Sequence, residues 1–324
     1  MRHGYIKTAA ATPYITVADC RANGEEIIRL IREMEKEHTK VMVFPELCIT
    51  GYTCQDLFLQ RRLLDSAWET LMRIAAATAD VDALIFLGVP VRNKGKLYNA
   101  AAVLNRGEIL GLVPKSYLPN YGEFYEQRHF VSGLGCLEFM SINGKKIPFG
   151  TNLLFVCEEL QELIVAAEIC EDLWVNMPPS VIHAQAGANL IVNLSASNEM
   201  VGKDSYRRSL VSGQSARLVC GYVYANAGEG ESTQDLVFGG QNMIAENGSI
   251  LAEGERFKNG IVYSEIDVQR LNDERKRLTT WQSCEDSDHL RIPFHLKMEE
   301  TKAYQTVFQI SFCAFPKVRE GSAM

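Results

Sequence analysis

Short apolar runs recur along the chain between helical segments, and this pattern predicts an α/β fold. The runs that predict buried strands are residues 5–11, 41–44, 83–89, 163–167, 190–194 and 221–226. The segments with apolar residues at helical spacing are 17–36, 63–80, 178–186 and 206–220. Most of the strands are apolar at every position, which is typical of strands buried on both faces. We therefore expect βαβ units with helices covering the sheet.

Two further segments predict β-hairpins. Residues 97–104 and 109–113 flank an Asn-Arg-Gly-Glu turn, and residues 241–253 fold back at Asn247-Gly248. Residues 120–130 are aromatic and charged without periodicity, as in a loop that lines a site. Residues 133–150 form a glycine-containing excursion with Lys145-Lys146 at its expected tip, to which no function is assigned.

Composition narrows the class of protein. The 324 residues are 47% hydrophobic and 23% charged, which indicates one large globular domain. The net charge of -7 argues against nucleic acid as a partner, because phosphate binding needs clustered Lys and Arg. The nine cysteines include no CxxC pair and no His-rich companion segment, so we expect reduced thiols and no metal site.

The N-terminal segment gives an expectation about location. Residues 1–5 lead into a strand that contains Lys7 and lacks the apolar core of a signal peptide. No segment approaches the ~20 apolar residues that span a bilayer. We expect a cytoplasmic protein that acts on small molecules and does not bind membranes.

Three reactive side chains follow three different buried strands. Glu46 follows residues 41–44, Lys115 follows residues 109–113, and Cys170 ends the run that begins at residue 163. Taken alone, each has an ordinary explanation as a solvated charge or a small buried thiol. The carboxyl ends of sheet strands meet in one crevice, however, so the three are expected to converge.

An acid, a cation and a thiol together suit amide cleavage. The reaction needs a base for the thiol proton, a donor for the tetrahedral oxyanion and an acid for the leaving ammonia. Glu46, Lys115 and the backbone N–H that follows Cys170 supply these groups. No histidine flanks Cys170 in the sequence, so a Cys-His pair has no local support, although one of the six histidines could approach it in space.

The chain resembles the nitrilase, or carbon-nitrogen hydrolase, superfamily at these residues. The finer resemblance is to the N-terminal glutaminase domain of glutamine-dependent NAD+ synthetases, and it covers about residues 5–280. The matching segments are Ala9–Pro13, Phe44–Tyr52 with Asp56–Phe58, Lys115–Tyr121 through Arg128–Phe130, Glu168–Trp174, and Asn193–Ser197 with Gly202–Lys203. The resemblance implies a four-layer αββα sandwich and at least a homodimer.

The resemblance also implies catalytic roles for the three strand-end residues. Glu46 would be the general base, Lys115 the oxyanion stabiliser and Cys170 the nucleophile that forms a glutamyl thioester. A second acid would position the lysine. Glu126 matches that position, but Glu123 lies within reach in the sequence, and the choice between them stays open at this stage.

Four more positions match those that hold the substrate, which would be L-glutamine. Tyr121 and Ser197 would bind its polar α-end, and Lys203 would pair with its carboxylate. Glu171 would place its backbone N–H toward the oxyanion. The resemblance implies no cofactor for this chain.

The resemblance ends before the C-terminus. The synthetase half of the family carries a Ser-Gly-Gly-x-Asp-Ser loop that does not occur in this chain, so we expect a hydrolase domain at residues 1–290 and a tail at residues 291–324. A synthetase domain or subunit is a candidate partner. Two other hypotheses remain open: a free-standing hydrolase of another small amide, carbamoyl compound or nitrile, and a binding module without catalysis.

Overall fold

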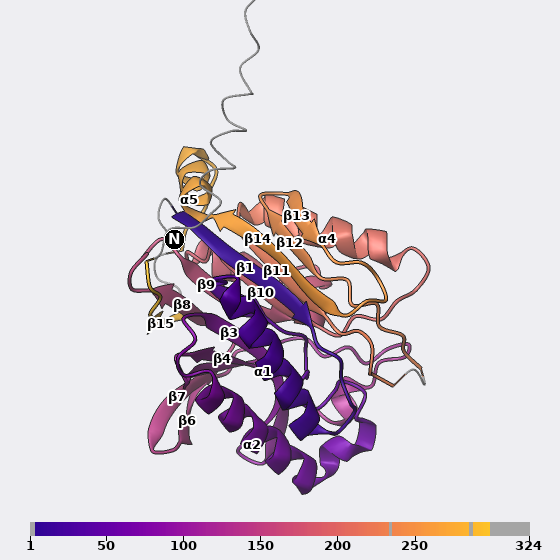
Figure 1. Cartoon of the computed structure of the whole chain (residues 1–324). Coiled ribbons are helices and arrows are strands. Elements are labelled where there is room, and N and C mark those ends of the chain that lie inside the picture. The colour runs from indigo at the N-terminus through magenta and orange to yellow at the C-terminus, as the bar shows by residue number, and fades with distance from the viewer. Residues whose placement is uncertain (1–3, 233–234, 285–287, 299–324) are drawn as a thin grey trace, which may run out of the picture.

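Two mixed β-sheets pack face to face in the computed structural model, which describes residues 4–232, 235–284 and 288–298 (Figure 1). The strands of the first sheet, in spatial order, are β14 (Gly260–Asp267), β1 (Tyr5–Thr12), β2 (Val41–Val43), β3 (Leu84–Asn93), β4 (Lys96–Asn105), β5 (Glu108–Pro114), β7 (Lys145–Gly150) and β6 (Leu137–Ile142). Those of the second are β13 (Ser249–Glu253), β12 (Met243–Glu246), β11 (Gly221–Asn226), β10 (Leu190–Ser195), β9 (Ile164–Ile169), β8 (Leu153–Cys157) and β15 (Leu290–Phe294).

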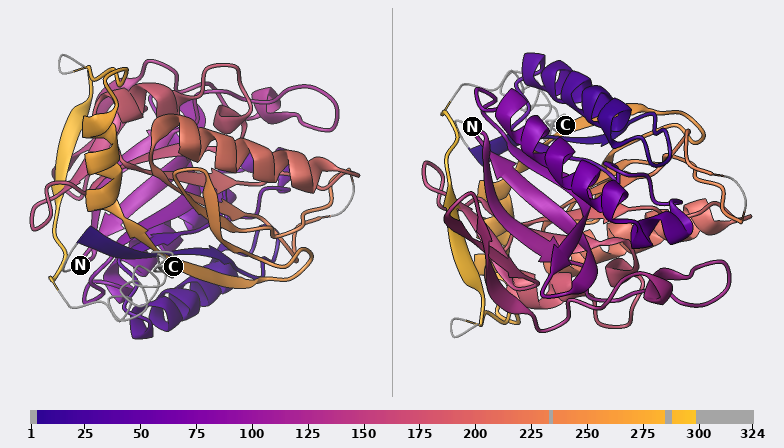
Figure 2. Two further views of the ribbon diagram at one scale, coloured as in Figure 1. Left: turned by 90° about the horizontal axis from the view of Figure 1, so that it is seen from above. Right: turned by 90° about the horizontal axis from the view of Figure 1, so that it is seen from below.

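Helices cover the outer faces of both sheets (Figure 2). The first sheet packs against α1 (Cys20–Lys36) and α2 (Arg61–Ala77), and the second against α3 (Pro179–Gln185) and α4 (Lys203–Leu218). A third apolar core lies between the two sheets. The predicted four-layer αββα sandwich is therefore confirmed, and α5 (Val268–Arg277) follows the edge strand β14.

Burial along the strands explains the apolar runs. The central strands β2 and β10 are buried at every residue because one face packs on the other sheet and the other face packs on helices. The edge strands β6 and β13 instead alternate exposed with partly buried residues. Their weaker pattern is the reason why sequence periodicity placed β6 in an irregular excursion.

The sequence analysis did not predict several of the strands and one helix. Residues 137–150 form the hairpin β6–β7, whose turn is at Asn143-Gly144, so the expected tip Lys145-Lys146 begins a strand. β8, β14, α5 and β15 were also not predicted. β15 pairs in parallel with β8, so the expected boundary at residue 290 falls inside a strand. The expected tail therefore contributes to the second sheet, and its residues 299–324 lie outside the described part of the chain.

The strands that precede the three reactive residues end at the same edge of the sandwich. β2, β5 and β9 run into Glu46, Lys115 and Cys170 respectively. Gly88 on β3 lets the backbone around Glu46 approach closely, because a Cβ there would lie 2.1 Å from the Leu47 nitrogen. Among the described helices, none is long and apolar enough to cross a membrane.

Candidate active site

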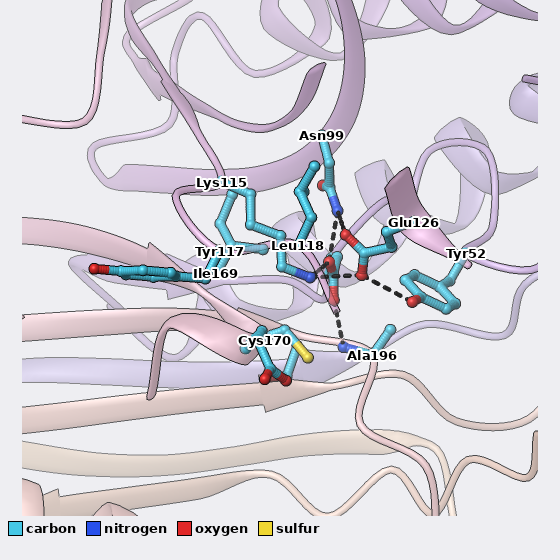
Figure 3. A network of polar contacts seen from close by, with 12 residues as sticks. Tyr52, Asn99, Lys115, Tyr117, Leu118, Glu126, Ile169, Cys170 and Ala196 are labelled. Atoms are coloured by element: carbon cyan, nitrogen blue, oxygen red, sulfur yellow. Dashed lines mark hydrogen bonds and ion pairs between the residues drawn. The ribbon is translucent and has the colours of Figure 1, made fainter. Parts of the chain in front are cut away.

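A fully buried cluster of two carboxylates and one ammonium occupies the end of the first sheet. The Lys115 Nζ lies 2.7 Å from the Glu46 Oε1 and 2.6 Å from the Glu126 Oε1 (Figure 3). Since a lysine ammonium has three donors, two are used by the carboxylates and one remains for another acceptor. Glu126 is thus the second acid beside the lysine, which resolves the choice between Glu126 and Glu123.

Three further groups orient the carboxylates. Asn99 Nδ2 donates to the Glu46 Oε1 at 2.5 Å, and the backbone N–H of Ala196 donates to the Glu46 Oε2 at 3.0 Å. The Tyr52 hydroxyl donates to the Glu126 Oε1 at 2.8 Å (Figure 3). Sequence analysis did not single out Asn99 or Tyr52. Tyr52 stood inside a matching segment, but Asn99 lies in the middle of a predicted hairpin strand, where no pattern marked it.

Burial and mutual attraction shift the pKa values within this cluster. Burial alone would lower the pKa of Lys115, but the carboxylates of Glu126 and Glu46 raise it well above its ordinary value. Burial raises the pKa of Glu126 to about 7, against the opposing effect of Lys115. The lysine is therefore held as a cation, and Glu126 changes charge near neutral pH.

Cys170 sits at a sharp turn between β9 and a 3-10 helix, η4 (Cys170–Leu173). Its φ of +46° is in the left-handed region, which a non-glycine residue adopts only under constraint. The turn directs the thiol toward the space that contains the Lys115 ammonium (Figure 3). Burial raises the pKa of Cys170, and the Glu46 carboxylate raises it further, so the resting thiol is protonated and needs a base.

The buried carboxylate of Asp172 ties this turn to the lysine loop. One oxygen accepts from the Ile169 N–H at 2.9 Å, and the other accepts from the Tyr117 N–H at 2.9 Å. Residue 117 follows Lys115 by two positions, so the Cys170 turn and the lysine are held by the same carboxylate. The sequence analysis placed Asp172 in a matching segment without assigning it a role.

A pocket of about 400 Å³ opens from Cys170 to the surface. All four residues expected to bind substrate line it: Tyr121, Glu171, Ser197 and Lys203. Its remaining lining comprises Pro119, Glu123, Phe124, Trp174, Met200, Val201, Gly202 and Tyr206. The structure therefore brings the predicted binding residues together above the thiol.

The pocket carries charge of both signs. Lys203 lies over the rings of Trp174 and Phe124, with Nζ 5.0 and 5.7 Å from their centroids, and burial lowers its pKa. Elsewhere in the lining, the Tyr121 hydroxyl donates to the Glu171 Oε1 at 2.7 Å. This combination matches a small molecule with a carboxylate and an ammonium at one end.

An amide links the pocket cation to a pocket carboxylate. The Asn198 Oδ1 accepts from Lys203, and its Nδ2 donates to Glu123. Behind it, the fully buried Arg207 donates to the Asn198 carbonyl at 2.9 Å and to the Ser197 hydroxyl at 3.3 Å. Glu123 thus belongs to the pocket wall, and neither Asn198 nor Arg207 was predicted.

Comparison with known proteins identifies the family of the chain. The chain matches the carbon-nitrogen hydrolase family over residues 7–276. It is 43% identical over 282 residues to a glutamine-dependent NAD(+) synthetase of Mycobacterium tuberculosis, covering 86% of this chain and 42% of that protein. With the corresponding Aquifex aeolicus protein it shares 34% identity, covering 81% of this chain and 42% of the relative. The chain therefore spans less than half the length of these relatives.

Solved structures give the same result. The crystal structure of a glutamine-dependent NAD(+) synthetase from Cytophaga hutchinsonii has a TM-score of 0.73 at 33% identity, and the match covers 81% of this chain and 43% of that one. An amidase from Nesterenkonia, at 20% identity, has a TM-score of 0.64 over 86% of this chain and 96% of its own. The latter similarity is one of fold.

Proposed function

Because this chain belongs to the carbon-nitrogen hydrolase family, we propose that it hydrolyses the side-chain amide of L-glutamine through a thioester on Cys170. The observation that carries the proposal is the pocket above the thiol, which has Lys203 on one wall and Glu171 on another. A free amino acid presents both a carboxylate and an ammonium, so it pairs with both walls. An apolar amide or nitrile would offer the half-buried Lys203 no carboxylate to pair with, so it should bind more weakly than a free amino acid.

The chemistry follows from the cluster. Glu46 takes the Cys170 proton as the sulfur attacks the amide carbon, and the carbonyl oxygen becomes an oxyanion. The remaining N–H of Lys115 and the backbone N–H of Glu171 donate to that oxyanion. Collapse of the intermediate breaks the C–N bond, and Glu46 returns its proton to the leaving ammonia. Water, deprotonated by Glu46, then attacks the thioester; the C–S bond breaks, glutamate is released, and Glu46 returns the proton to the Cys170 sulfur.

The destination of the ammonia is a separate part of the proposal. The similar proteins of Mycobacterium and Aquifex are described as glutamine-dependent NAD(+) synthetases, and this chain spans 42% of their length. We propose that the chain is the ammonia-supplying part of such a synthetase, with a synthetase domain or subunit as its partner. We also predict that the chain forms a homodimer. Light scattering at micromolar concentration would test this prediction by giving the mass of the particle.

The decisive experiment is a comparison of amide substrates. We expect ammonia release to be faster from L-glutamine than from glutaramate, which lacks the α-ammonium, or from an N-carbamoyl amino acid. A glutamine-mimicking diazoketone should form a covalent adduct on the peptide that contains Cys170, as read by mass spectrometry. Slow glutamine turnover in the absence of a synthetase would be compatible with the proposal. A carbamoyl compound that ranked above glutamine would contradict it and would indicate a free-standing amidase.

A further inference from the structure

A row of buried polar side chains crosses the outer face of the second sheet behind Cys170. Glu168 on β9 and Asn193 on β10 are aligned neighbours, and Tyr222 lies on the next strand, β11. Each is at most 1% exposed. They share the face of Ala166 and Ile191, which packs in the apolar layer beneath α3 and α4. Burying polar groups in such a layer lowers the stability of the fold unless all of them are hydrogen-bonded, so we expect their hydrogen bonds to hold a neighbouring group in place.

The row ends on the backbone of the nucleophile. Glu168 accepts from the Ser180 N–H at 2.9 Å and from the Tyr222 hydroxyl. The Tyr222 oxygen in turn accepts from the Asn193 Nδ2 at 3.1 Å. Asn193 then presents its Oδ1 to the Cys170 N–H at 3.1 Å.

The direction of each hydrogen bond follows from the carboxylate. When Glu168 is ionised it can only accept, so the Tyr222 hydroxyl donates to it and has only its oxygen left for Asn193. This oxygen selects the NH2 end of the Asn193 amide, which leaves the carbonyl end for Cys170. If the Asn193 amide were flipped, its NH2 group would face the Cys170 N–H, and two donors would lie against each other. Glu168 thus reinforces the amide orientation that two donors at the other end also require, namely the Cys170 N–H and the Ser195 hydroxyl, which lies 2.7 Å from the Asn193 Oδ1.

The hydrogen bond between the Cys170 N–H and Asn193 restrains a residue whose backbone is strained. Cys170 adopts φ +46°, and its N–H is the first of the 3-10 turn, which has no partner within that turn. We propose that Glu168 and Tyr222 are positioning residues: through Asn193 they hold Cys170 in the left-handed conformation that aims its sulfur at the substrate amide. They also keep the Cys170 N–H away from the oxyanion, which leaves that task to Lys115 and Glu171. This inference rests on the proposed amide hydrolysis.

The test removes one link at a time in the full chain. Tyr222→Phe deletes only the hydroxyl, and we expect kcat for L-glutamine to fall about 10- to 100-fold while KM changes less than about threefold, because Tyr222 does not line the pocket. Glu168→Gln should have a similar effect. In this variant the Ser180 N–H donates to the amide oxygen of residue 168, so the NH2 group of residue 168 faces Tyr222. The Tyr222 hydroxyl must then accept from residue 168 and donate to Asn193, which reverses the Asn193 amide. The double variant should be no worse than the more damaged single variant, since both break one chain.

A control separates positioning from general loss of stability. Ser215→Ala, in the same helix-covered layer, removes a hydrogen bond of 2.7 Å to the Cys220 carbonyl and one of 3.3 Å from the Gly248 N–H, and neither of these bonds involves a residue of the row. It should lower Tm and leave kcat unchanged. The inference is overturned if Tyr222→Phe lowers Tm as Ser215→Ala does but keeps kcat within about twofold of wild type. A rise in KM at constant kcat would overturn it as well.

A substrate-independent readout distinguishes this inference from the proposed function. Cys170 alkylation by iodoacetamide, followed by mass spectrometry, should slow at least about threefold in Tyr222→Phe and in Glu168→Gln. The exposed Cys284 is the internal reference and should react at an unchanged rate. If wild type hydrolyses no glutamine yet alkylation slows in both variants, the proposed function fails and the positioning role stands. Unchanged alkylation of Cys170 overturns the positioning role.

Discussion

The two halves of the site differ in how much water reaches them. Lys115, Glu46 and Glu126 are almost completely buried, and each is held by several hydrogen bonds of 2.5–3.0 Å to neighbours. The pocket above them is open at its mouth, where the Tyr121 side chain is 60% exposed. Both halves carry charges of both signs, so the contrast lies in burial rather than in composition.

This contrast assigns different tasks to the two halves. Inside the cluster, electrostatic interactions are strong because water does not screen them, and the groups cannot reorient during the reaction. At the pocket mouth, solvent screens the charges, and each contact adds a modest amount of binding energy. Substitutions in the cluster should therefore affect mainly kcat and stability, and those in the pocket mainly KM.

Cys170→Ala should have the largest effect on activity. Alanine removes the sulfur that we propose as the nucleophile but little volume, so we expect a loss of at least about 10⁴-fold in amide hydrolysis with an unchanged fold. Ammonia release and circular dichroism measure the two quantities. If the variant retained full turnover, acyl transfer through this residue would be excluded.

Lys115→Met should damage both activity and stability. It leaves Glu46 and Glu126 buried next to each other without their cation, and breaking a buried ion pair in this way costs about 3–5 kcal/mol. Urea denaturation measures the loss. Lys146→Met, at an exposed position of β7, is the matched control and should stay within about 0.5 kcal/mol of wild type. Equal losses in the two variants would contradict the role given to burial.

Glu126→Gln should change the pH dependence. The pKa of Glu126 is about 7, so in the wild type this carboxylate loses its charge as the pH falls through 7, and we expect kcat/KM to fall with it. The variant, always neutral here, should have low activity without this step. Stability supplies a second readout with a defined sign. The folded pKa is raised from 4.5, so the free energy of unfolding of the wild type decreases as pH rises from about 4.5 to 7, and the variant lacks that decrease. Identical pH profiles would refute the assignment.

Lys203→Ala should affect binding more than turnover. We expect KM for L-glutamine to rise by a factor equivalent to about 1.5–3 kcal/mol, the value of a charge-assisted hydrogen bond, with a smaller change in kcat. Steady-state kinetics measures both constants, and Lys258→Ala, at an exposed surface lysine, is the control. A drop in kcat alone would place Lys203 in the reaction itself and remove the distinction between the two halves.

Tyr121→Phe should have the smallest effect. Its hydroxyl contacts Glu171 at the open mouth of the pocket, so its removal should raise KM by no more than about 1 kcal/mol. The same kinetic assay tests it. If Tyr121→Phe raised KM as much as Lys203→Ala does, the exposed side of the pocket at Tyr121 would contribute as much to binding as the half-buried side at Lys203.

Sequence analysis singled out the three candidate catalytic residues because strand ends are visible in a sequence. Glu46, Lys115 and Cys170 each follow an apolar run. An acid, a cation and a thiol are the groups that amide cleavage needs, so reaction chemistry was enough to consider them together. Asn99 and Asn193 stand inside strands, and nothing in periodicity tells which face of the sheet they occupy or what lies behind it. A polar residue in an otherwise apolar strand is the signal that could have marked Asn193.

The sequence by itself determined the alternation of buried strands and helices, the order of the reactive residues and their resemblance to a family. Only the tertiary structure decided that Glu126 rather than Glu123 contacts Lys115, that Glu123 belongs to the pocket wall with Asn198, and that β15 completes the second sheet. Apolar periodicity is local, because it reflects which side of one element faces a core. Pairing between distant side chains depends on how strands from different parts of the chain are brought side by side, and no short stretch of sequence contains that information.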